Sequence, residues 1–318
     1  MIDIILATYN GEAFLAQQIK SIQNNAGYHK WVNKIIVTDD GSTDGTQTII
    51  ATLSAQDSKI VWIKNSSGSK GPKANFAFGL SQSTTQYIML CDQDDIWLPH
   101  KIETSIKHLK QAESTSLPQT PLLIFSDKQI VDENLQQICS SYFTLKNISK
   151  EWHLQFNQLC QQNVISGCTM LFNRALIDKA LPIPEKAYMH DWWLALVAHR
   201  CGEIVFIDQT LIQYRQHHAN VIGAKHRGQL SLCFQFFKHL RSFKESQQAI
   251  INQASAFKAF EQKNKMTADA TINTLSRLNY LPMHKKISYF CKGNVTRSHL
   301  LGRLALLTSL LTSKRHRH

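Results

Sequence analysis

The chain has 318 residues, of which 43% are hydrophobic and 18% charged, so an intrinsically disordered protein is excluded and one large domain with an appended segment is expected. Its 35 Lys and Arg residues outnumber its 23 Asp and Glu residues, which gives a formal net charge of +12. A basic surface attracts the phosphates of nucleotides, nucleic acid or anionic lipid headgroups, although a solvated surface rich in lysine explains the same charge.

The sequence predicts a protein of the reducing cytoplasm. The first residues, MIDIILATYNGEAF, lack the basic region and the small-residue cleavage site of a signal peptide. No run reaches the roughly 18 consecutive apolar residues of a spanning helix. The seven cysteines are odd in number and include no CxxC pair, which argues against a zinc site and against a disulfide framework.

The first 113 residues alternate short apolar runs with segments of helical periodicity. Such alternation predicts βαβ units and a mainly parallel sheet. Ser42 and Thr43 are candidate N-caps of the second helix, and Pro99 lies near the first turn of the fourth. The predicted strands are 2–8, 33–40, 59–65 and 86–92, and the predicted helices begin near residues 12, 42, 74 and 99.

From about residue 120 the alternation becomes less regular. Further strands are predicted at 121–127 and 163–173, and the stretch 203–215 indicates a pair of short strands. The strongly apolar segment 190–202 is predicted to be a helix that ends at Gly202. These features extend the predicted α/β fold, a mainly parallel sheet flanked by helices, over a domain of residues 1–222.

The remaining residues, 223–318, are predicted to form a basic helical extension. It ends in SHLLGRLALLTSLLTSKRHRH, a short apolar helix followed by a cationic tail. This helix is too short to span a bilayer but suits the membrane surface, where Lys and Arg meet anionic headgroups. Packing on the core or a contact in a homodimer explains the pattern equally well.

Polar residues gather where three predicted strands end. The first strand ends at ATYN, the second at TDDGSTDG and the fourth at CDQDD. Ligands of open parallel sheets bind beyond the carboxyl ends of the strands, so the sequence predicts a ligand site at this edge. Asp39 and Asp40 can accept hydrogen bonds from a base or a ribose, or form an acidic turn. Tyr9 can stack on a base or pack in the core.

The segment CDQDD predicts a metal site. In an extended segment residues i and i+2 point the same way, so Asp92 and Asp94 are expected on one side and Asp95 on the other, where it anchors the following turn. Two carboxylates so close together repel unless a cation lies near them. Mg²⁺ or Mn²⁺, completed by water and phosphate oxygens, fits such a pair. His217 and His218 are either structural or a further metal or phosphate contact.

Asp191 is the candidate general base. It follows His190 at the start of the predicted helix 190–202. An acidic residue there is often only a cap, but a carboxylate far along the chain from a metal cluster is also what a base facing that cluster requires. Phosphatases of the haloacid dehalogenase type also carry a DxD after a strand. Theirs usually lies at the first strand, which disfavours that class.

Taken together, these residues resemble the family-2 inverting glycosyltransferases of the GT-A fold. The segments CDQDDIWLPHKI and YRQHHANVIG are most similar to bacterial rhamnosyltransferase-type members that build surface polysaccharides such as O-antigen and capsule. The QxxRW motif of processive synthases is absent, which favours the addition of a single sugar. The motifs of the resemblance span residues 2–222 and are ILATYNGEAFLAQQIKSI, IIVTDDGSTDGT, YIMLCDQDDIW, ISGCTMLFNR and HDWWL.

The resemblance implies a role for each candidate residue. Lys73 would approach the diphosphate, Asp94 would be the direct metal ligand, and Asp92 would face the sugar or ribose. Asp191 would be the catalytic base, and Asp40 is favoured for reading the nucleotide base. The donor nucleotide would be bound by residues at the ends of the first two strands: Ala7, Thr8, Tyr9, Asp39 and Asp40.

The expected reaction is the metal-dependent, inverting transfer of one sugar, with rhamnose favoured, from a dTDP- or UDP-sugar to a glycan or lipid-linked oligosaccharide. One alternative is a sugar nucleotidyltransferase, but LATYNGEAF lacks the Gly-rich, Arg- or Lys-bearing loop of that class. The other is a non-catalytic nucleic-acid-binding protein, whose basic residues should cluster with aromatics on one face. Here they are spread along the chain and concentrate at the C-terminus, so no nucleic-acid partner is expected.

Lipid binding by the terminal helix would hold the enzyme at the inner face of the cell membrane.

Overall fold

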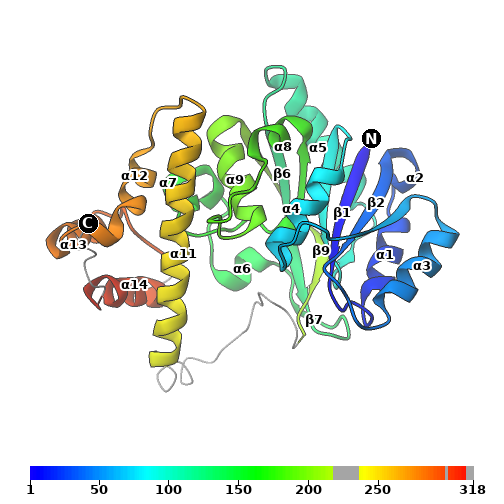
Figure 1. The fold of residues 1–318 in the computed structure, drawn as a ribbon, viewed down its shortest axis with the longest axis horizontal. Helices are drawn as coiled ribbons and strands as arrows, with labels where there is room; N and C mark the ends of the chain where they lie inside the picture. Colours follow the sequence, from blue (N-terminus) through cyan, green and yellow to red (C-terminus); the bar gives the residue numbers. More distant parts are fainter. Residues whose placement is uncertain (218–235, 298–299, 313–318) are drawn as a thin grey trace. The chain divides into compact units, whose positions relative to one another are not determined.

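The computed structural model describes residues 1–217, 236–297 and 300–312 (Figure 1). The chain divides into two compact units. The sheet unit comprises Met1–Lys146, Ile165–Ile183 and Met189–Ala224, and the helical unit comprises Asn147–Val164, Pro184–Tyr188 and Lys225–His318. The helical unit therefore includes two segments that precede residue 222, and residue 222 itself lies outside the described residues.

The sheet unit contains a mixed, mainly parallel sheet, as predicted, whose strands run in the order β3-β2-β1-β4-β8-β6-β9-β5 with β7 paired to β6. Strands β1 to β4 are parallel to one another, and β8 lies antiparallel between β4 and β6. Because β6 and β9 are again parallel, two parallel groups flank one reversed strand. The strands are β1 Ile2–Thr8, β2 Val32–Asp39, β3 Ile60–Lys64, β4 Tyr87–Asp92, β5 Ile96–Trp97, β6 Leu122–Val131, β7 Gln137–Cys139, β8 Met170–Asn173 and β9 Glu203–Arg215.

Two strand predictions need correction. Of the predicted strand 163–173 only Met170–Asn173 is extended, and Gly167–Thr169 forms a 3₁₀ turn. The stretch 203–215 forms one strand rather than a pair. Its pairing with β6 steps from Ile207 to Thr210, so two residues fall out of register there. Such a bulge bends a strand without ending it, which is why the polar residues in its middle resembled a turn.

Helices cover both faces of the sheet in the sheet unit (Figure 1). The side chains of Ile4 and Leu6 on β1 share a buried cluster with apolar residues of α1 and α5. On the opposite face α4 packs so closely that a Cβ on Gly79 would meet Ile5 Cγ2 at 2.4 Å. The helices of this unit are α1 Leu15–Gln23, α2 Tyr28–Trp31, α3 Thr46–Gln56, α4 Pro72–Gln82, α5 Lys101–Thr115, α6 Tyr142–Lys146, α8 Arg174–Ala180 and α9 His190–Cys201.

The helical unit is built around the long helix α11, Phe236–Lys263. Phe257 of this helix is fully buried. Asp269 caps the next helix, α12, by accepting hydrogen bonds from two backbone N–H groups. None of the described helices combines the length and apolar character needed to cross a membrane. The remaining helices of this unit are η1 Trp152–Leu154, α7 Phe156–Leu159, α12 Ala270–Ser276, η3 Leu278–Tyr280, α13 Met283–Cys291 and α14 Leu300–Thr312.

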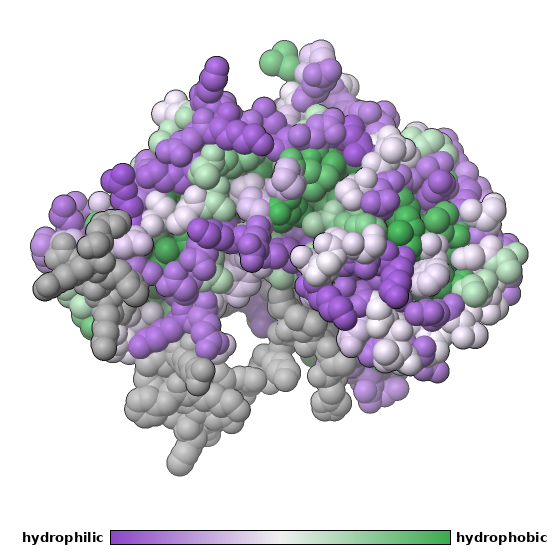
Figure 2. All heavy atoms as spheres, viewed as in Figure 1, coloured by the Kyte–Doolittle hydropathy of each residue, from purple (hydrophilic) through white to green (hydrophobic). Residues whose placement is uncertain are grey.

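The visible face of the molecule is largely hydrophilic, with smaller hydrophobic patches between the polar side chains (Figure 2). Among the exposed large apolar side chains are Leu304 and Leu311 of α14, at 52% and 49% exposure, whereas Leu306 and Leu310 of the same helix are buried. Helix α14 therefore packs one side within the helical unit and leaves leucines on the other. The predicted cationic tail after it, 313–318, lies outside the described residues.

Candidate active site

The carboxyl ends of β1, β2 and β4 meet at one edge of the sheet. Thr8 pairs with Asp39 across β1 and β2, and Ala7 pairs with Asp92 across β1 and β4. Tyr9 follows directly and is 55% exposed. The structure thus brings together the polar strand ends that the sequence singled out.

The loops that follow β1 and β2 hold each other by reciprocal hydrogen bonds. The Asn10 N–H donates to Ser42 Oγ at 2.9 Å, and the Thr43 N–H donates back to Asn10 Oδ1 at 2.9 Å. The Gly11 N–H donates to Thr46 Oγ1 at 2.8 Å. Asn10 has a φ of 48°, a left-handed conformation that asparagine tolerates better than most residues. These hydrogen bonds tie the ends of β1 and β2 together.

Asp39 and Asp40 take different partners within the protein. Asp39 Oδ1 accepts from Ser42 Oγ at 2.6 Å, whereas its buried Oδ2 has no hydrogen-bond partner among the described residues. Asp40 accepts from Asn65 Nδ2 at 3.0 Å and from the Gly71 N–H at 2.7 Å. Asp40, favoured for reading the base, thus also anchors the loop that leads into α4. Asp39 retains the spare acceptor.

Helix α4 begins beside these carboxylates. Lys73 lies in its first turn and is partly exposed, so its position agrees with the expected approach to a diphosphate. Asn75, two residues later, is buried and donates from Nδ2 to Thr38 O at 2.8 Å and to Thr8 O at 3.3 Å. This amide ties the start of α4 to the ends of β1 and β2.

Gln93 is a site residue that the sequence reasoning missed. Its Oε1 accepts from Thr8 Oγ1 at 2.6 Å and from the Tyr9 N–H at 2.9 Å, and its Nε2 donates to Tyr9 O at 3.2 Å. A Cβ on Gly11 would meet Gln93 Oε1 at 2.5 Å, so the glycine provides the space for this clamp. The middle residue of the DxD segment therefore fixes the end of β1.

The acidic residues at the end of β4 fall into two groups, whereas the sequence predicted Asp92 and Asp94 together on one face. Ligand atoms of Asp92, Asp95 and Cys168 all lie within 4.8 Å of one another, whereas Asp94 Oδ2 lies 2.7 Å from His217 Nε2. The expectation that Asp95 projects away from Asp92 is wrong. The chain turns at residues 93 and 94, so the alternation of an extended strand does not apply there.

Asp95 also has a different anchoring role from the predicted one. Its Oδ1 accepts from the Arg215 N–H at 3.2 Å, which ties it to the end of β9 rather than to the following turn. Its Oδ2 is buried without a hydrogen-bond partner among the described residues. The Arg215 guanidinium in turn donates to Asp94 O at 2.9 Å and to Gln17 Oε1 at 2.6 Å. Strand β9 thus supports the acidic segment.

The electrostatics of this cluster favour a bound cation. Burial, followed by the charge of Asp94, raises the pKa of Asp92 to about 7. Burial, followed by the charges of Asp94 and Asp92, raises the pKa of Asp95 well above its usual value. A hard divalent ion prefers oxygen ligands and would relieve this repulsion. Cys168 is an unsuitable ligand for such an ion, since burial raises the pKa of its thiol.

Lys128 of β6 is the second site residue that the sequence reasoning missed. It is 6% exposed, its Nζ donates to Ser166 Oγ at 2.8 Å, and the same atom lies 3.8 Å from the centre of the Tyr214 ring. Its charge lowers the pKa values of both Asp92 and Asp191. A buried ammonium therefore acts on the metal-site candidate and on the base candidate together.

Asp191 lies in the first turn of α9, as predicted, and faces the same cluster. Its Oδ1 accepts from the Trp192 N–H at 2.6 Å and its Oδ2 from the Gly167 N–H at 3.2 Å. Burial of the carboxylate is the main reason why its pKa rises to about 6. Its charge also raises the pKa of Asp92, so the two carboxylates lie in a common field.

His190, directly before Asp191, is buried and stacks on Phe76 with ring centroids 4.1 Å apart. Burial lowers its pKa to about 3, so the imidazole is neutral at physiological pH. It serves to seat the start of α9 on α4. His218, the second histidine of the predicted pair, lies outside the described residues.

A mainly parallel sheet with acidic strand ends and a reversed strand beside them is like that of the GT-A class of nucleotide-sugar-binding folds. The chain belongs to glycosyl transferase family 2, whose model matches residues 3–180. An uncharacterized glycosyltransferase of Rickettsia typhi is 29% identical over 223 residues, which cover 69% of this chain and 65% of the relative. An uncharacterized glycosyltransferase of Methanocaldococcus jannaschii is 26% identical over 223 residues, covering 68% and 70%.

Two solved structures agree with this fold over nearly the whole chain. TarS of S. aureus in complex with UDP-GlcNAc has a TM-score of 0.56 at 14% identity, covering 98% of this chain and 90% of that one. The mannosyltransferase PcManGT of Pyrobaculum calidifontis, in complex with GDP-Man and Mn²⁺, has a TM-score of 0.54 at 11% identity, covering 98% and 86%. At these identities the similarity establishes the fold, helical segments after the sheet included.

Proposed function

We propose that this chain is an inverting glycosyltransferase that transfers a single sugar from a nucleoside diphosphate sugar to a hydroxyl of an acceptor glycan. The observation that carries the proposal is the position of Asp191, at the start of α9. Its Oδ2 accepts from the Gly167 N–H. The Sγ atom of the next residue, Cys168, lies within 4.8 Å of ligand atoms of Asp92 and Asp95. These two carboxylates belong to an acidic cluster suited to a divalent ion, and that of Asp191 is free to act on an acceptor. Membership of glycosyl transferase family 2 supports this reading.

In this proposal the acidic cluster holds Mn²⁺ or Mg²⁺. Asp92 and Asp94 are the ligands expected from the sequence, and the buried spare oxygen of Asp95 makes it a third candidate. His217, hydrogen-bonded to Asp94, either orients that carboxylate or binds the ion itself. When bound, the ion would stabilise the charge that develops on the departing diphosphate. The Mn²⁺ in the similar P. calidifontis structure supports this choice of ion.

Asp191 is the proposed base. Two backbone N–H groups hold its carboxylate in one orientation, so a lone pair can be directed at an acceptor hydroxyl. Its raised pKa of about 6 makes it a stronger base than an ordinary aspartate while it stays ionised at neutral pH. Attack by the deprotonated hydroxyl on the face opposite the diphosphate inverts the anomeric carbon.

The donor is bound at the ends of β1 and β2 in this proposal. Exposed Tyr9 offers a face for stacking, and Asp39 and Asp40 provide acceptors for the base and ribose. Lys73 at the start of α4 would meet the diphosphate. We propose a dTDP- or UDP-sugar, with rhamnose favoured by the segments CDQDDIWLPHKI and YRQHHANVIG, and UDP-GlcNAc in the similar TarS structure supports a uridine donor.

The proposed acceptor is a glycan or lipid-linked oligosaccharide of bacterial surface polysaccharide synthesis. In support, a GalNAc(5)-diNAcBac-PP-undecaprenol beta-1,3-glucosyltransferase of Campylobacter jejuni is 32% identical over 103 residues, 32% of each chain. The matched part spans 65% of the length of the R. typhi relative.

A nucleotide-sugar screen tests the function. Among dTDP-, UDP- and GDP-sugars, we expect dTDP-rhamnose or a UDP-sugar to raise the melting temperature in the presence of Mn²⁺, and EDTA to abolish that shift. The stabilising donor is then assayed for nucleotide release with and without acceptor glycans. Transfer that is unaffected by chelator would refute the metal assignment, and a chain that binds random-sequence DNA but no nucleotide sugar would refute the enzyme.

We further propose that the enzyme works in the cytoplasm at the inner face of the cell membrane, with α14 lying on the lipid surface. The exposed Leu304 and Leu311 and the net charge of +12 support this location. Replacing both leucines by serine should move the protein from the membrane fraction to the supernatant. Unchanged fractionation, with a changed oligomeric state on gel filtration, would instead assign this face to a homodimer.

A further inference from the structure

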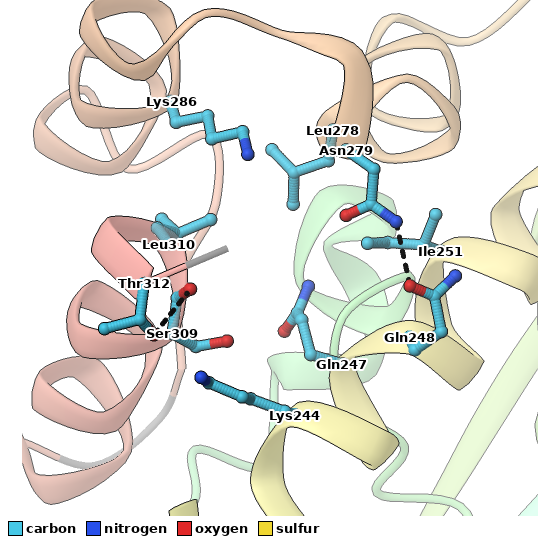
Figure 3. Close-up of a pocket in the computed structure, with 10 residues that line it drawn as sticks. All are labelled: Lys244, Gln247, Gln248, Ile251, Leu278, Asn279, Lys286, Ser309, Leu310 and Thr312. Atoms are coloured by element: carbon cyan, nitrogen blue, oxygen red, sulfur yellow. Dashed lines mark hydrogen bonds between the residues drawn. The ribbon is translucent and has the colours of Figure 1, made fainter. Parts of the chain in front are cut away.

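A pocket with polar and apolar lining lies within the helical unit, between α11, η3, α13 and α14 (Figure 3). Its volume is about 210 Å³. This is smaller than the roughly 300–1,000 Å³ of pockets that hold drug-sized ligands, but much larger than the roughly 30 Å³ share of one water molecule. The pocket therefore suits a small ligand of a few heavy atoms or the terminal group of a larger one.

The lining of this pocket is cationic. Of the described residues that line it, Lys244 and Lys286 are basic and none is acidic. Lys286 is 2% exposed, and burial lowers the pKa of its ammonium. In Figure 3 the side chains of both lysines extend into the space between the helices. An anion in that space would therefore stabilise the charged form of Lys286.

Gln247 adds a hydrogen-bond donor to the same space. Its Oε1 accepts from Arg297 Nη2 at 2.7 Å, and this bond fixes which way the amide faces. The residue is 5% exposed, and its buried Nε2 has no hydrogen-bond partner among the described residues. A buried amide N–H₂ without an acceptor is costly, so a ligand oxygen at this position would stabilise the folded chain.

Arg297 extends the positive charge behind Gln247. It is 9% exposed, and its Nη1 donates to Gln161 O at 2.7 Å. Neutral polar residues, among them Ser309, which is 5% exposed, and the apolar residues Ile251, Leu278 and Leu310 complete the lining. Two ammonium groups, an unsatisfied amide and a hydroxyl around one small space match the acceptor-only surface of a tetrahedral oxyanion.

We propose that this pocket binds a phosphate group through Lys244, Lys286 and Gln247. The phosphate belongs either to free inorganic phosphate or to a phosphoryl headgroup carried by a lipid or a lipid-linked glycan. The site lies wholly in the helical unit and does not depend on the proposed transferase activity. Its failure would leave the sheet-edge site unaffected.

Binding of inorganic phosphate, measured by calorimetry in a phosphate-free buffer at constant ionic strength, tests the proposal. We expect Lys286→Met and Gln247→Leu each to weaken phosphate binding by about tenfold or more, because each removes a donor to an anion. The matched control is Lys285→Met, since Lys285 is the exposed neighbour on the same helix. Binding of UDP in the presence of Mn²⁺ should be the same in all these proteins.

Lys244→Met is the second variant in case Lys286→Met fails to fold, since Lys244 is partly exposed. Glycerol 3-phosphate and vesicles containing phosphatidic acid distinguish the sources. Loss of vesicle binding in the pocket variants supports a headgroup, and loss of binding to inorganic phosphate alone supports the free ion. The proposal would be overturned if wild type and the pocket variants bound phosphate with equal affinity. It would also be overturned if Lys285→Met lost as much phosphate affinity as the pocket variants, or if chloride gave the same binding signal as phosphate.

Discussion

His217 Nε2 lies 2.7 Å from Asp94 Oδ2, although 123 residues separate them in the chain. The His217 ring also packs against Phe14, with ring centroids 4.8 Å apart and the ring planes tilted by 37°. The contact with Asp94 joins His217, two residues after the end of β9, to the second aspartate of the DxD segment. Any ion bound by Asp94 therefore meets a carboxylate whose orientation is set by this histidine.

Replacing His217 by Ala should weaken the response to metal. Removing a hydrogen-bond partner of a ligating carboxylate typically costs about 10- to 100-fold in metal affinity. We therefore expect the Mn²⁺ concentration for half-maximal transfer to rise by about that factor. His29→Ala, an exposed histidine on α2, is the control and should leave the titration unchanged. An unaltered Mn²⁺ dependence in His217→Ala would reduce the contact to a structural one.

Asp191→Asn should lower the transfer rate by about 10²- to 10⁴-fold, which is the usual contribution of a general base. Binding of the donor should persist, because the amide oxygen can still accept from one backbone N–H. The matched change Asp178→Asn, at an exposed position on α8, should have no effect. Steady-state rates and donor titrations measured side by side separate the two effects. Near-full activity in Asp191→Asn would mean that another group takes the proton.

With Asp191 as the proposed base, Lys128 should set the pH at which it works. The base accepts a proton only when ionised, so the rate should fall as the pH drops below the Asp191 pKa of about 6. The Lys128 charge lowers that pKa, and removing the charge must raise it. Lys128→Met should therefore shift the acidic limb of the pH–rate profile upward by about one unit at saturating Mn²⁺. Methionine retains an unbranched apolar stem against Tyr214.

Lys128→Arg keeps the positive charge, so the acidic limb of its pH–rate profile should lie at the same pH as in wild type. Lys107→Met removes an exposed lysine on α5 and controls for net charge. A limb that stays in place in Lys128→Met, even if the rate falls, would limit Lys128 to packing.

The sequence predicts the first four strands and their polar ends well, because both depend on local patterns. Apolar runs and the residues directly after them are visible without knowing the fold, and Asp191 could be found as an acid that opens an apolar helix. Lys128 and Gln93 could not, because their partners are distant: Ser166 lies 38 residues from Lys128, and Thr8 lies 85 residues from Gln93.

The arrangement of the three aspartates was mispredicted for a related reason. A strand rule places Asp95 opposite Asp92, but the turn after β4 returns it to the same cluster, and its anchor is the Arg215 N–H. That anchor is 120 residues away along the chain. Local periodicity carries no information about such a contact.

Gln93→Leu tests whether the clamp on β1 matters for the donor. The change keeps the size of the side chain but removes its three hydrogen bonds to Thr8 and Tyr9. These hydrogen bonds are exposed or partly buried, and one such bond contributes about 0.5–1.5 kcal/mol, so the unfolding free energy should fall by about that amount. The end of β1 would lose its fixed position, and the donor KM should rise by about tenfold or more while Mn²⁺ dependence changes little. Gln82→Leu, at an exposed position on α4, is the matched control. A variant that loses stability but binds the donor as wild type does would show that Gln93 supports only the fold.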